Sequence, residues 1–225
     1  MALFVSGSGT GVGKTLVTTI LLSEIRKAGK KCTAVKPIIS GFDENDPAES
    51  DSALILGALG QTVSQNSLDS ISPWRFREPI SPDMAAEHEG RSLDIDEIAE
   101  FCKAKVVDDT LLLIEGVGGV MVPLSNDHTV LDLMTKISAP VLLVVGSYLG
   151  TLSHTLTALH MVQNRGLTVI GIVVSESLEN PVPLSETVTT LSRFSANIPI
   201  VTLPRQADIS DLENAPSIAT HIGLL

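Results

Sequence analysis

The chain has 225 residues, of which 44% are hydrophobic and 3% aromatic, and its formal net charge at pH 7 is −11. This length and apolar content suffice for one full hydrophobic core, and no change of composition marks a boundary, so we expect a single domain over residues 1–225. The negative charge repels a phosphate backbone and the few aromatic rings offer little surface for stacking bases, which excludes nucleic acid as a partner.

The sequence also argues against a membrane protein. No apolar run reaches the ~18 residues that a membrane-spanning helix needs, and the N-terminus enters a strand pattern without a basic region or a cleavage site. We therefore expect a soluble protein of the cytoplasm. The cysteines, Cys32 and Cys102, lack metal-ligand spacing and lie in apolar patterns, so they are interpreted as free buried thiols.

The first predicted strand, Leu3–Val5, leads into a glycine-rich loop that ends in Gly-Lys-Thr at residues 13–15, before a helical pattern. Glycines let backbone N–H groups turn inward around phosphates, the lysine neutralises phosphate oxygens, and the threonine hydroxyl can bind Mg²⁺. The outer glycine is Gly7, one residue further out than the strict Walker pattern requires, where Ser8 stands. The loop predicts nucleotide binding by a deviant P-loop; the alternative is a glycine-rich turn without a ligand.

A second predicted strand, Cys32–Val35, ends at Lys36. The carboxyl ends of parallel strands face the ligand crevice of an open α/β sheet, so we expect Lys36 near the phosphates. A Pro-x-x-x-Gly turn over residues 37–41 would direct its side chain; the alternative is a solvated lysine at a strand end. An acidic loop then leads into a helix predicted over Asp51–Leu59, where Asp51 is either the N-cap or a carboxylate for a metal ion.

The middle of the chain supplies a second candidate carboxylate. Residues 61–82 are polar and interrupted by prolines, and Trp74 and Phe76 are expected to hold them against the body. The Pro79–Pro82 stretch is either the wall of a pocket or a plain loop. A helix predicted over residues 94–106 precedes an apolar strand that ends in Glu115. A carboxylate at the end of a buried strand is what a Walker-B-type Mg²⁺ site requires; the alternative is an ordinary strand-end acid.

The last third of the chain alternates helices with strands: helices over 129–137, 149–164 and 183–194, and strands over 140–146, 169–174 and 200–203. The helix start at Gly150–Ser153 can bind an anionic group such as a carboxylate, although ordinary capping explains it equally well. Ser175, Glu176 and Pro204–Gln206 follow the last strands and are expected beside the nucleotide base. The histidines have no ligand spacing and are interpreted as structural or surface residues.

The alternation of strands and helices along the whole chain predicts an α/β protein of P-loop NTPase type, with a mostly parallel, doubly wound sheet and helices on both faces.

Six separated motifs occur in one order, and with them the chain resembles the dethiobiotin synthetase family, the ATP-dependent carboxylases of biotin biosynthesis. The resemblance covers nearly the whole chain. The motifs are Gly7-x-x-Thr10-x-Val12-Gly13-Lys14-Thr15, Lys36-Pro37-x-x-Ser40-Gly41, Ser50-Asp51-x-Ala53, Pro79-x-Ser81-Pro82-x-x-Ala85-Ala86, Glu115-Gly116-x-Gly118-Gly119-x-x-Val122-Pro123-Leu124 and Leu149-Gly150-x-x-x-His154-x-Leu156-Thr157.

The resemblance implies a carboxylation followed by ring closure. One amine of 7,8-diaminononanoate takes up CO₂ as a carbamate, ATP phosphorylates the carbamate, and the second amine closes the ureido ring with release of ADP and phosphate. The family pattern makes Lys36 and Lys14 catalytic and places Ser40 beside the diamine. It makes Thr15, Asp51 and Glu115 the partners of Mg²⁺.

The resemblance also implies a set of nucleotide contacts and a partner subunit. Members are commonly homodimers, so the helix start formed by Gly150, Thr151, Leu152 and Ser153 would receive the carboxylate tail of the substrate bound in the partner subunit. The implied nucleotide contacts are Gly11, Val12, Gly13, Lys14, Thr15, Leu16, Asp51, Glu115, Gly116, Val117, Gly118, Ser175, Glu176, Pro204, Arg205 and Gln206.

Three features depart from the family pattern. Gly9 and Gly11 stand where many members have acidic residues, so side-chain contacts to ATP are absent there. Ser175 stands where an asparagine often reads the base, which predicts some tolerance of other nucleoside triphosphates. Thr187 stands where some members have a tyrosine near the substrate tail, which puts that contact in doubt.

Other classes of protein share parts of this pattern. A partition-type ATPase needs a second lysine early in the loop, where Gly9 stands, and a basic amphipathic tail that the sequence lacks. An amidotransferase of the cobyrinate type needs an added glutaminase domain, for which the chain has no room. A nucleotide-binding regulator without catalysis stays open, and it predicts no phosphate release with any diamine.

Overall fold

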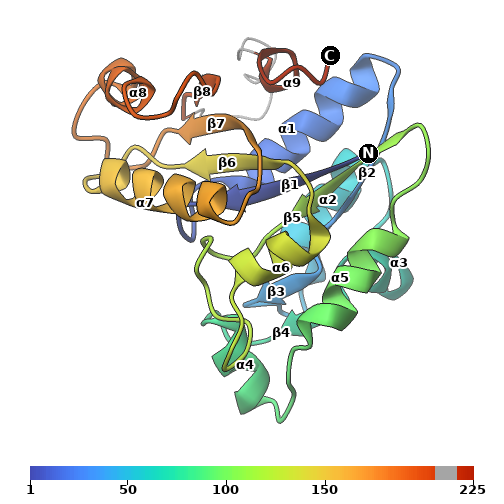
Figure 1. Cartoon of the computed structure of the whole chain (residues 1–225). Coiled ribbons are helices and arrows are strands. Elements are labelled where there is room, and N and C mark those ends of the chain that lie inside the picture. The colour runs from blue at the N-terminus through green and yellow to red at the C-terminus, as the bar shows by residue number, and fades with distance from the viewer. Residues whose placement is uncertain (206–216) are drawn as a thin grey trace.

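The structure is a computed structural model that describes residues 1–205 and 217–225. Its centre is a six-stranded sheet in which all neighbouring strands run parallel, in the order β2-β5-β1-β6-β7-β8 (Figure 1). The predicted α/β class with a mostly parallel sheet is confirmed. The strands are β1 (Ala2–Gly7), β2 (Lys31–Val35), β5 (Thr110–Glu115), β6 (Val141–Val145), β7 (Val169–Ser175) and β8 (Ile200–Leu203).

Helices cover both faces of this sheet. α1, which contacts α2 and α9, lies on one face, and α5, α6 and α7 lie across the other (Figure 1). Because neither face meets water, the inner strands are apolar along almost their whole length, and β5 is buried from Leu111 to Glu115. The helices are α1 (Lys14–Lys27), α2 (Asp51–Ala58), α3 (Gln65–Ile71), α4 (Pro82–His88), α5 (Ile95–Ala104), α6 (Val130–Ile137), α7 (Thr151–Asn164), α8 (Leu184–Ser192) and α9 (Ile218–His221).

The chain changes its direction across the sheet beside β1. From β1 it passes through α1 to β2 at one edge, whereas from β5 it passes through α6 to β6 on the opposite side of β1. In doubly wound sheets the ligand crevice opens at the carboxyl ends of the strands that flank such a reversal. The glycine-rich loop follows β1 and Glu115 ends β5, so the topology brings these two motifs to the same crevice.

The turn predicted over residues 37–41 is wrong. Ile38–Ser40 forms a short strand, β3, which pairs in parallel with β4, Trp74–Phe76, in a separate two-stranded sheet. The chain turns only at Gly41, the last residue of the predicted stretch, whose φ is 76° and where a Cβ atom would lie 3.0 Å from Pro79. This close approach holds the proline-rich segment beside Lys36. The aromatic anchoring predicted here is present, since Trp74 packs edge-on against a neighbouring ring and Phe76 is buried.

Several short elements escape the sequence prediction. α3 and α4 have seven residues each, α9 has four, and a 3₁₀ turn, η1, spans Pro47–Glu49. Elements of two turns or fewer do not repeat an apolar face often enough to be recognised by periodicity. They pack on their neighbours instead: α3 on α2 and β2, α4 on β3 and β4, η1 on α2, and α9 on α1 and β8.

No helix in the described part of the chain is long and apolar enough to cross a membrane. Both cysteines are free. Cys102 is buried, and burial raises the pKa of its thiol to about 12. Cys32 is only half-buried, so the prediction of a fully buried thiol is wrong for this residue.

Candidate active site

The glycine-rich loop wraps around the space beyond the end of β1. Gly11 and Gly13 have φ angles of 71° and 91°, a left-handed conformation that glycine adopts without strain. No side chain of the described residues caps α1, so its first backbone N–H groups stay available to an anion. The Lys14 side chain crosses the loop, where its Nζ donates to the carbonyl oxygens of Gly9 (3.1 Å) and Gly118 (2.7 Å).

Glu115 lies beneath this loop and is 0% exposed. Its Oε1 accepts hydrogen bonds from the Thr15 hydroxyl (2.6 Å) and from Lys36 Nζ (2.7 Å). Its Oε2 accepts a hydrogen bond from the Thr18 hydroxyl (2.6 Å). The structure therefore brings Thr15 and Glu115 together, as expected from the order of the motifs. Thr18 joins them without having been singled out from the sequence.

Lys36 follows β2 and points between two carboxylates, those of Glu115 and Asp51, and pairs with both. The residue is buried, and burial alone would lower the pKa of its ammonium. The charges of Glu115 and Asp51 and their hydrogen bonds outweigh burial, so the pKa of Lys36 is raised. Lys36 is therefore a cation at neutral pH and not a base.

Asp51 is not the N-cap of α2. Ser50 caps the helix, with its Oγ accepting a hydrogen bond from the backbone N–H of Ala53 (3.2 Å). The Asp51 carboxylate in the first turn is thereby free to reach Lys36. Burial tends to raise the pKa of Asp51, but the charge and hydrogen bond of Lys36 lower it overall. Asp51 therefore remains an anion beside the loop.

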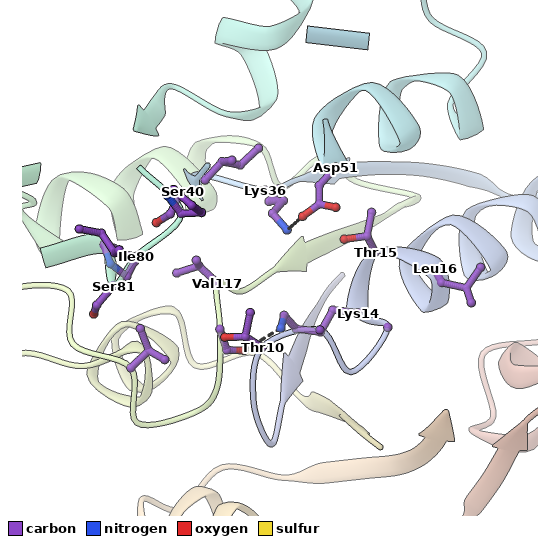
Figure 2. A pocket seen from close by; sticks show the side chains of 17 residues that line it. Thr10, Lys14, Thr15, Leu16, Lys36, Ser40, Asp51, Ile80, Ser81 and Val117 are labelled. Carbon is purple, nitrogen blue, oxygen red and sulfur yellow. Dashed lines mark hydrogen bonds and ion pairs between the residues drawn. The ribbon is translucent and has the colours of Figure 1, made fainter. Parts of the chain in front are cut away.

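A cavity of about 570 Å³ connects the glycine-rich loop with Lys36 and the proline-rich segment. In Figure 2, Lys36 and Asp51 point toward each other beside Thr15, and Ser40 and Ser81 lie on the other side of the space. The Oγ atoms of these two serines are buried without a hydrogen-bond partner in the described part of the chain. Because such groups are costly to leave unpaired, they mark where a polar ligand is expected to bind.

Ten of the residues predicted for the site meet in this cavity. Those that line it are Gly11, Gly13, Lys14, Thr15, Leu16, Lys36, Ser40, Asp51, Val117 and Gly118. Val12 and Glu115 are buried and do not line it, and Gly116 packs so closely on Phe4 that a Cβ atom would lie 2.9 Å from its ring. The pocket-wall alternative for Pro79–Pro82 is the one that the structure bears out. Lining residues outside these predictions are Thr10, Ile39 and Val122.

Solved structures resemble this chain in fold. The septum site-determining protein MinD from Pyrococcus horikoshii OT3, complexed with Mg-ADP, superposes with a TM-score of 0.58 at 17% identity, covering 100% of this chain and 92% of that one. The cell division ATPase MinD of Pyrococcus furiosus superposes with a TM-score of 0.55 at 16% identity, covering 96% and 89%. At such low identity the likeness concerns the fold alone, and it agrees with the predicted α/β class with a mostly parallel sheet.

Sequence relatives decide the family. A family profile described as an AAA domain matches residues 1–213. The ATP-dependent dethiobiotin synthetase BioD of Phenylobacterium zucineum (strain HLK1) is 45% identical over 205 residues, which are 90% of this chain and 88% of the relative. That of Caulobacter sp. (strain K31) is 42% identical over 223 residues, 98% and 94% of the two chains. The chain belongs to the dethiobiotin synthetase family. Membership confirms the predicted enzyme class, an ATP-dependent ligase that forms carbon–nitrogen bonds.

The described residues that the family pattern assigns to the nucleotide base lie outside the cavity, at the ends of β7 and β8. The Glu176 carboxylate accepts a hydrogen bond from the Arg205 backbone N–H (2.8 Å), which joins the two strand ends into one surface. Ser175 borders the glycine-rich loop, since a Cβ atom on Gly13 would lie 2.8 Å from its Oγ. Pro204 is exposed beside Arg205, and Gln206 lies outside the described residues.

The start of α7, assigned by the family pattern to the substrate tail, does not line the cavity of its own chain. The Thr151 hydroxyl donates to the Gly146 carbonyl (2.6 Å), which is a local contact within the loop. Gly150 turns the chain into the helix with a φ of 99°. In the described part of the chain, the backbone N–H groups of Leu152 and Ser153 have no partner, so they stay available to an anion.

The oxygen atoms around Lys36 fit a divalent cation. The Asp51 and Glu115 carboxylates already hold one cation, the Lys36 ammonium, and the Thr15 hydroxyl shares Oε1 of Glu115. Mg²⁺ prefers such hard oxygen ligands and usually combines one or two carboxylates with substrate phosphates. Within residues 1–205 and 217–225, no three His, Cys, Asp or Glu side chains could hold a metal by themselves. The donor set therefore fits Mg²⁺ that binds together with a nucleotide.

We expect ADP binding to weaken as the pH rises above about 8. Burial and, to a lesser degree, the charge of Lys36 lower the pKa of Lys14 to about 8. Only the ammonium form neutralises phosphate oxygens, and bound phosphates raise the pKa of Lys14 again. Since the pKa is higher in the complex than in the free protein, binding takes up a proton above pH 8, and affinity falls up to about tenfold per pH unit. Calorimetric titration in buffers of different ionisation enthalpy measures both the affinity for ADP and the number of protons taken up on binding.

The matched control for this pH dependence is Lys14→Arg. The guanidinium of arginine keeps its charge throughout this range, so the variant should bind ADP without proton uptake. An equally steep loss of affinity in Lys14→Arg would show that another group titrates.

Proposed function

We propose that the chain carboxylates 7,8-diaminononanoate with CO₂ and then closes the ureido ring, with conversion of ATP to ADP and phosphate. Ring closure gives dethiobiotin. One amine nitrogen bonds to CO₂ and forms a carbamate. A carbamate oxygen then takes the γ-phosphoryl group from ATP, and the second amine attacks the carbonyl carbon and displaces phosphate. The observation that carries the proposal is the shared cavity, which Lys14, Lys36, Ser40 and Ser81 line together. The two serine hydroxyls have no hydrogen-bond partner among the residues that the structure describes.

The chemistry requires cations because it brings two anions, a carbamate and a triphosphate, into contact. We assign Lys14 to the phosphates, which it would reach by leaving the Gly9 and Gly118 carbonyls. We assign Lys36 to the carbamate and the transferring phosphoryl group. The raised pKa of Lys36 supports this role, since the side chain stays an ammonium while it is shielded from water. A fixed charge at a buried site acts more strongly than one in water.

Thr15, Asp51 and Glu115 are the residues that would hold Mg²⁺. When bound, the metal supplies further positive charge to the terminal phosphates. The Thr15 hydroxyl and the Asp51 carboxylate line the cavity, whereas Glu115 is buried beneath them. We therefore assign Thr15 and Asp51 to the exposed side of the metal site, with Glu115 orienting the Thr15 hydroxyl from below.

Ser40 and Ser81 are assigned to the diamine end of the substrate. Both hydroxyls lack a hydrogen-bond partner within residues 1–205 and 217–225, and both residues line the cavity with Lys36 (Figure 2). A hydroxyl can accept from an amine and donate to a carbamate oxygen, so the pair can hold the substrate before and after carboxylation. Ser40 was expected here from the family pattern. Ser81 lies in the quoted Pro-x-Ser-Pro motif, but no role was assigned to it.

We further propose a homodimer in which the α7 start of one subunit receives the substrate tail from the partner's cavity. The free N–H groups of Leu152 and Ser153 can bind a carboxylate, and they do not face the cavity of their own chain. Leu149, which precedes them, is 87% exposed and would be covered in such an interface. Sedimentation with and without diaminononanoate tests the assembly.

The proposed nucleotide contacts extend from the loop to the ends of β7 and β8. The phosphates would lie at the start of α1 and the base at the surface that Glu176 and Arg205 share. We also propose a single-domain enzyme of the cytoplasm, because the strands share one core and the free thiols fit a reducing compartment. The full set of proposed contacts is the one given by the family pattern.

The decisive assay combines diaminononanoate, bicarbonate, Mg²⁺ and ATP, and measures ureido product and phosphate in the same samples. We expect equal amounts of the two products, neither of which forms when the diamine is omitted. ADP binding without phosphate release for this diamine would support the regulator that the sequence left open.

A nucleotide panel is expected to give modest selectivity. Ser175 replaces the amide that often reads the base, and a short hydroxyl cannot make the paired contacts that separate adenine from other bases. We expect GTP, CTP and UTP to support ureido formation with kcat/KM within about tenfold of ATP, since each lost base hydrogen bond is worth about 1 kcal/mol. A preference for ATP of several orders of magnitude would contradict this prediction.

A further inference from the structure

Thr18 contacts Glu115, one of the residues proposed for the metal site, from outside the cavity. It lies one turn beyond Thr15 on the same side of α1 and is 0% exposed. Its hydroxyl lies 2.6 Å from Glu115 Oε2 and 3.0 Å from the Lys14 carbonyl oxygen. A hydroxyl has one proton, so only one of these two oxygens receives it at a time.

The distances favour the carboxylate as the acceptor. Threonine within a helix commonly donates to the carbonyl oxygen four residues earlier, and that bond alone would be an ordinary feature of α1. Hydrogen bonds to an ionised carboxylate are shorter and stronger than those to a neutral carbonyl, which agrees with the shorter contact to Glu115. Thr18 therefore binds Glu115 and stays close to the Lys14 carbonyl.

This bond decides how Glu115 presents its other oxygen. The terminal torsion of a glutamate side chain has a broad, roughly two-fold profile, so the chain itself does not choose the plane of the carboxylate. Thr15 and Lys36 both donate to Oε1, which leaves Thr18 as the one donor recorded for Oε2 in the described part of the chain. Without Thr18, a rotation of the carboxylate would redirect Oε1 away from the cavity side.

We propose that Thr18 is a positioning residue, which fixes the Glu115 carboxylate so that Oε1 stays directed at Thr15, Lys36 and the metal site. The inference rests on the proposed function, because that function supplies the Mg²⁺ and the nucleotide at the Glu115 site. Thr18 touches no ligand itself because the residue is fully buried. It acts through Glu115.

The test is Thr18→Val, which keeps the branched shape and removes the hydroxyl. We expect binding of Mn²⁺ to the ADP complex, measured by electron paramagnetic resonance, to weaken about 10–100-fold, the usual range for residues that orient metal ligands. Binding of ADP without metal should stay unchanged, and kcat should fall while KM for the diamine does not. The matched control is Thr19→Val, because the Thr19 hydroxyl donates to the Leu16 carbonyl (2.8 Å) on the same helix and not to Glu115.

Thr18→Ser should restore most of the Mn²⁺ affinity, since serine keeps the hydroxyl and loses only a methyl group. If serine fails to restore it, or if Thr18→Val behaves like Thr19→Val, Thr18 has only a packing role and the proposal is overturned. A loss of metal-free ADP binding in parallel with a lower melting temperature leads to the same conclusion. The metal-binding readout does not depend on ureido formation, so failure of the proposed function in wild type is seen separately.

Discussion

Replacing Lys36 with alanine is expected to lower kcat/KM for ureido formation by about 10³-fold or more, while metal-free ADP binding changes little. The reason is electrostatic: removal of one preorganised charge aimed at a developing anion costs about 10²–10³ in rate, and removal of a charge on a transferring phosphoryl group costs more. Coupled measurement of product and phosphate under single-turnover conditions isolates the chemical step. Turnover of Lys36→Ala at the wild-type rate would remove Lys36 from the mechanism.

Lys36→Ala is also expected to lower the stability of the protein, so the control variants must separate stability from activity. Lys36 is paired with Glu115, which is 0% exposed, so its removal leaves a buried carboxylate without its cation. Such losses can cost about 3–5 kcal/mol of stability. Lys36→Arg keeps the charge but changes its shape, so it should restore folding without restoring full activity. Lys31→Ala, at the exposed start of the strand that precedes Lys36, should match wild type in both stability and activity.

Replacing Glu115 with glutamine is expected to lower kcat about 10²–10³-fold and to raise the Mg²⁺ concentration needed for half-maximal rate at least tenfold. The amide keeps the volume of the side chain but loses the charge that Lys36 and the metal site share. Asp51 still pairs with Lys36, and the threonine hydroxyls can rotate to accept from the amide, so the protein should remain folded. Rates measured over a series of Mg²⁺ concentrations give the change in kcat and in the Mg²⁺ requirement, and thermal melting shows whether the variant is folded.

The same substitution has a consequence for the pH profile. Glu115 is the largest influence that raises the pKa of Lys36, so its neutralisation lowers that pKa. The ammonium is the active form, which means that the alkaline limb of activity should move to lower pH in Glu115→Gln. The control is Glu100→Gln, because Glu100 forms an exposed ion pair with Lys103 on α5. This substitution should leave the pH profile unchanged. An unshifted alkaline limb in Glu115→Gln would indicate that Lys36 does not control it.

The sequence by itself determined the features that depend on local spacing. An apolar run followed by glycines and Gly-Lys-Thr specifies a strand, a phosphate loop and a helix, because glycine adopts the positive φ angles at Gly11 and Gly13 without strain. The buried strand before Glu115 was equally clear, since helices on both faces of a parallel sheet demand uninterrupted apolar residues. The family also followed from the order of the motifs.

Only the tertiary structure decided which side chains meet. Lys36 lies 15 positions from Asp51 and 79 from Glu115 in the chain. It meets Glu115 because β2 and β5 are neighbours in the sheet, and it meets Asp51 because α2, which packs on α1, begins at Asp51. Ser50, and not Asp51, proved to cap α2, a choice that depends on where the helix packs. Thr18 shows the limit most clearly. Its spacing on α1 reads as ordinary core, and only the position of β5 beside β1 turns its hydroxyl into a partner of Glu115.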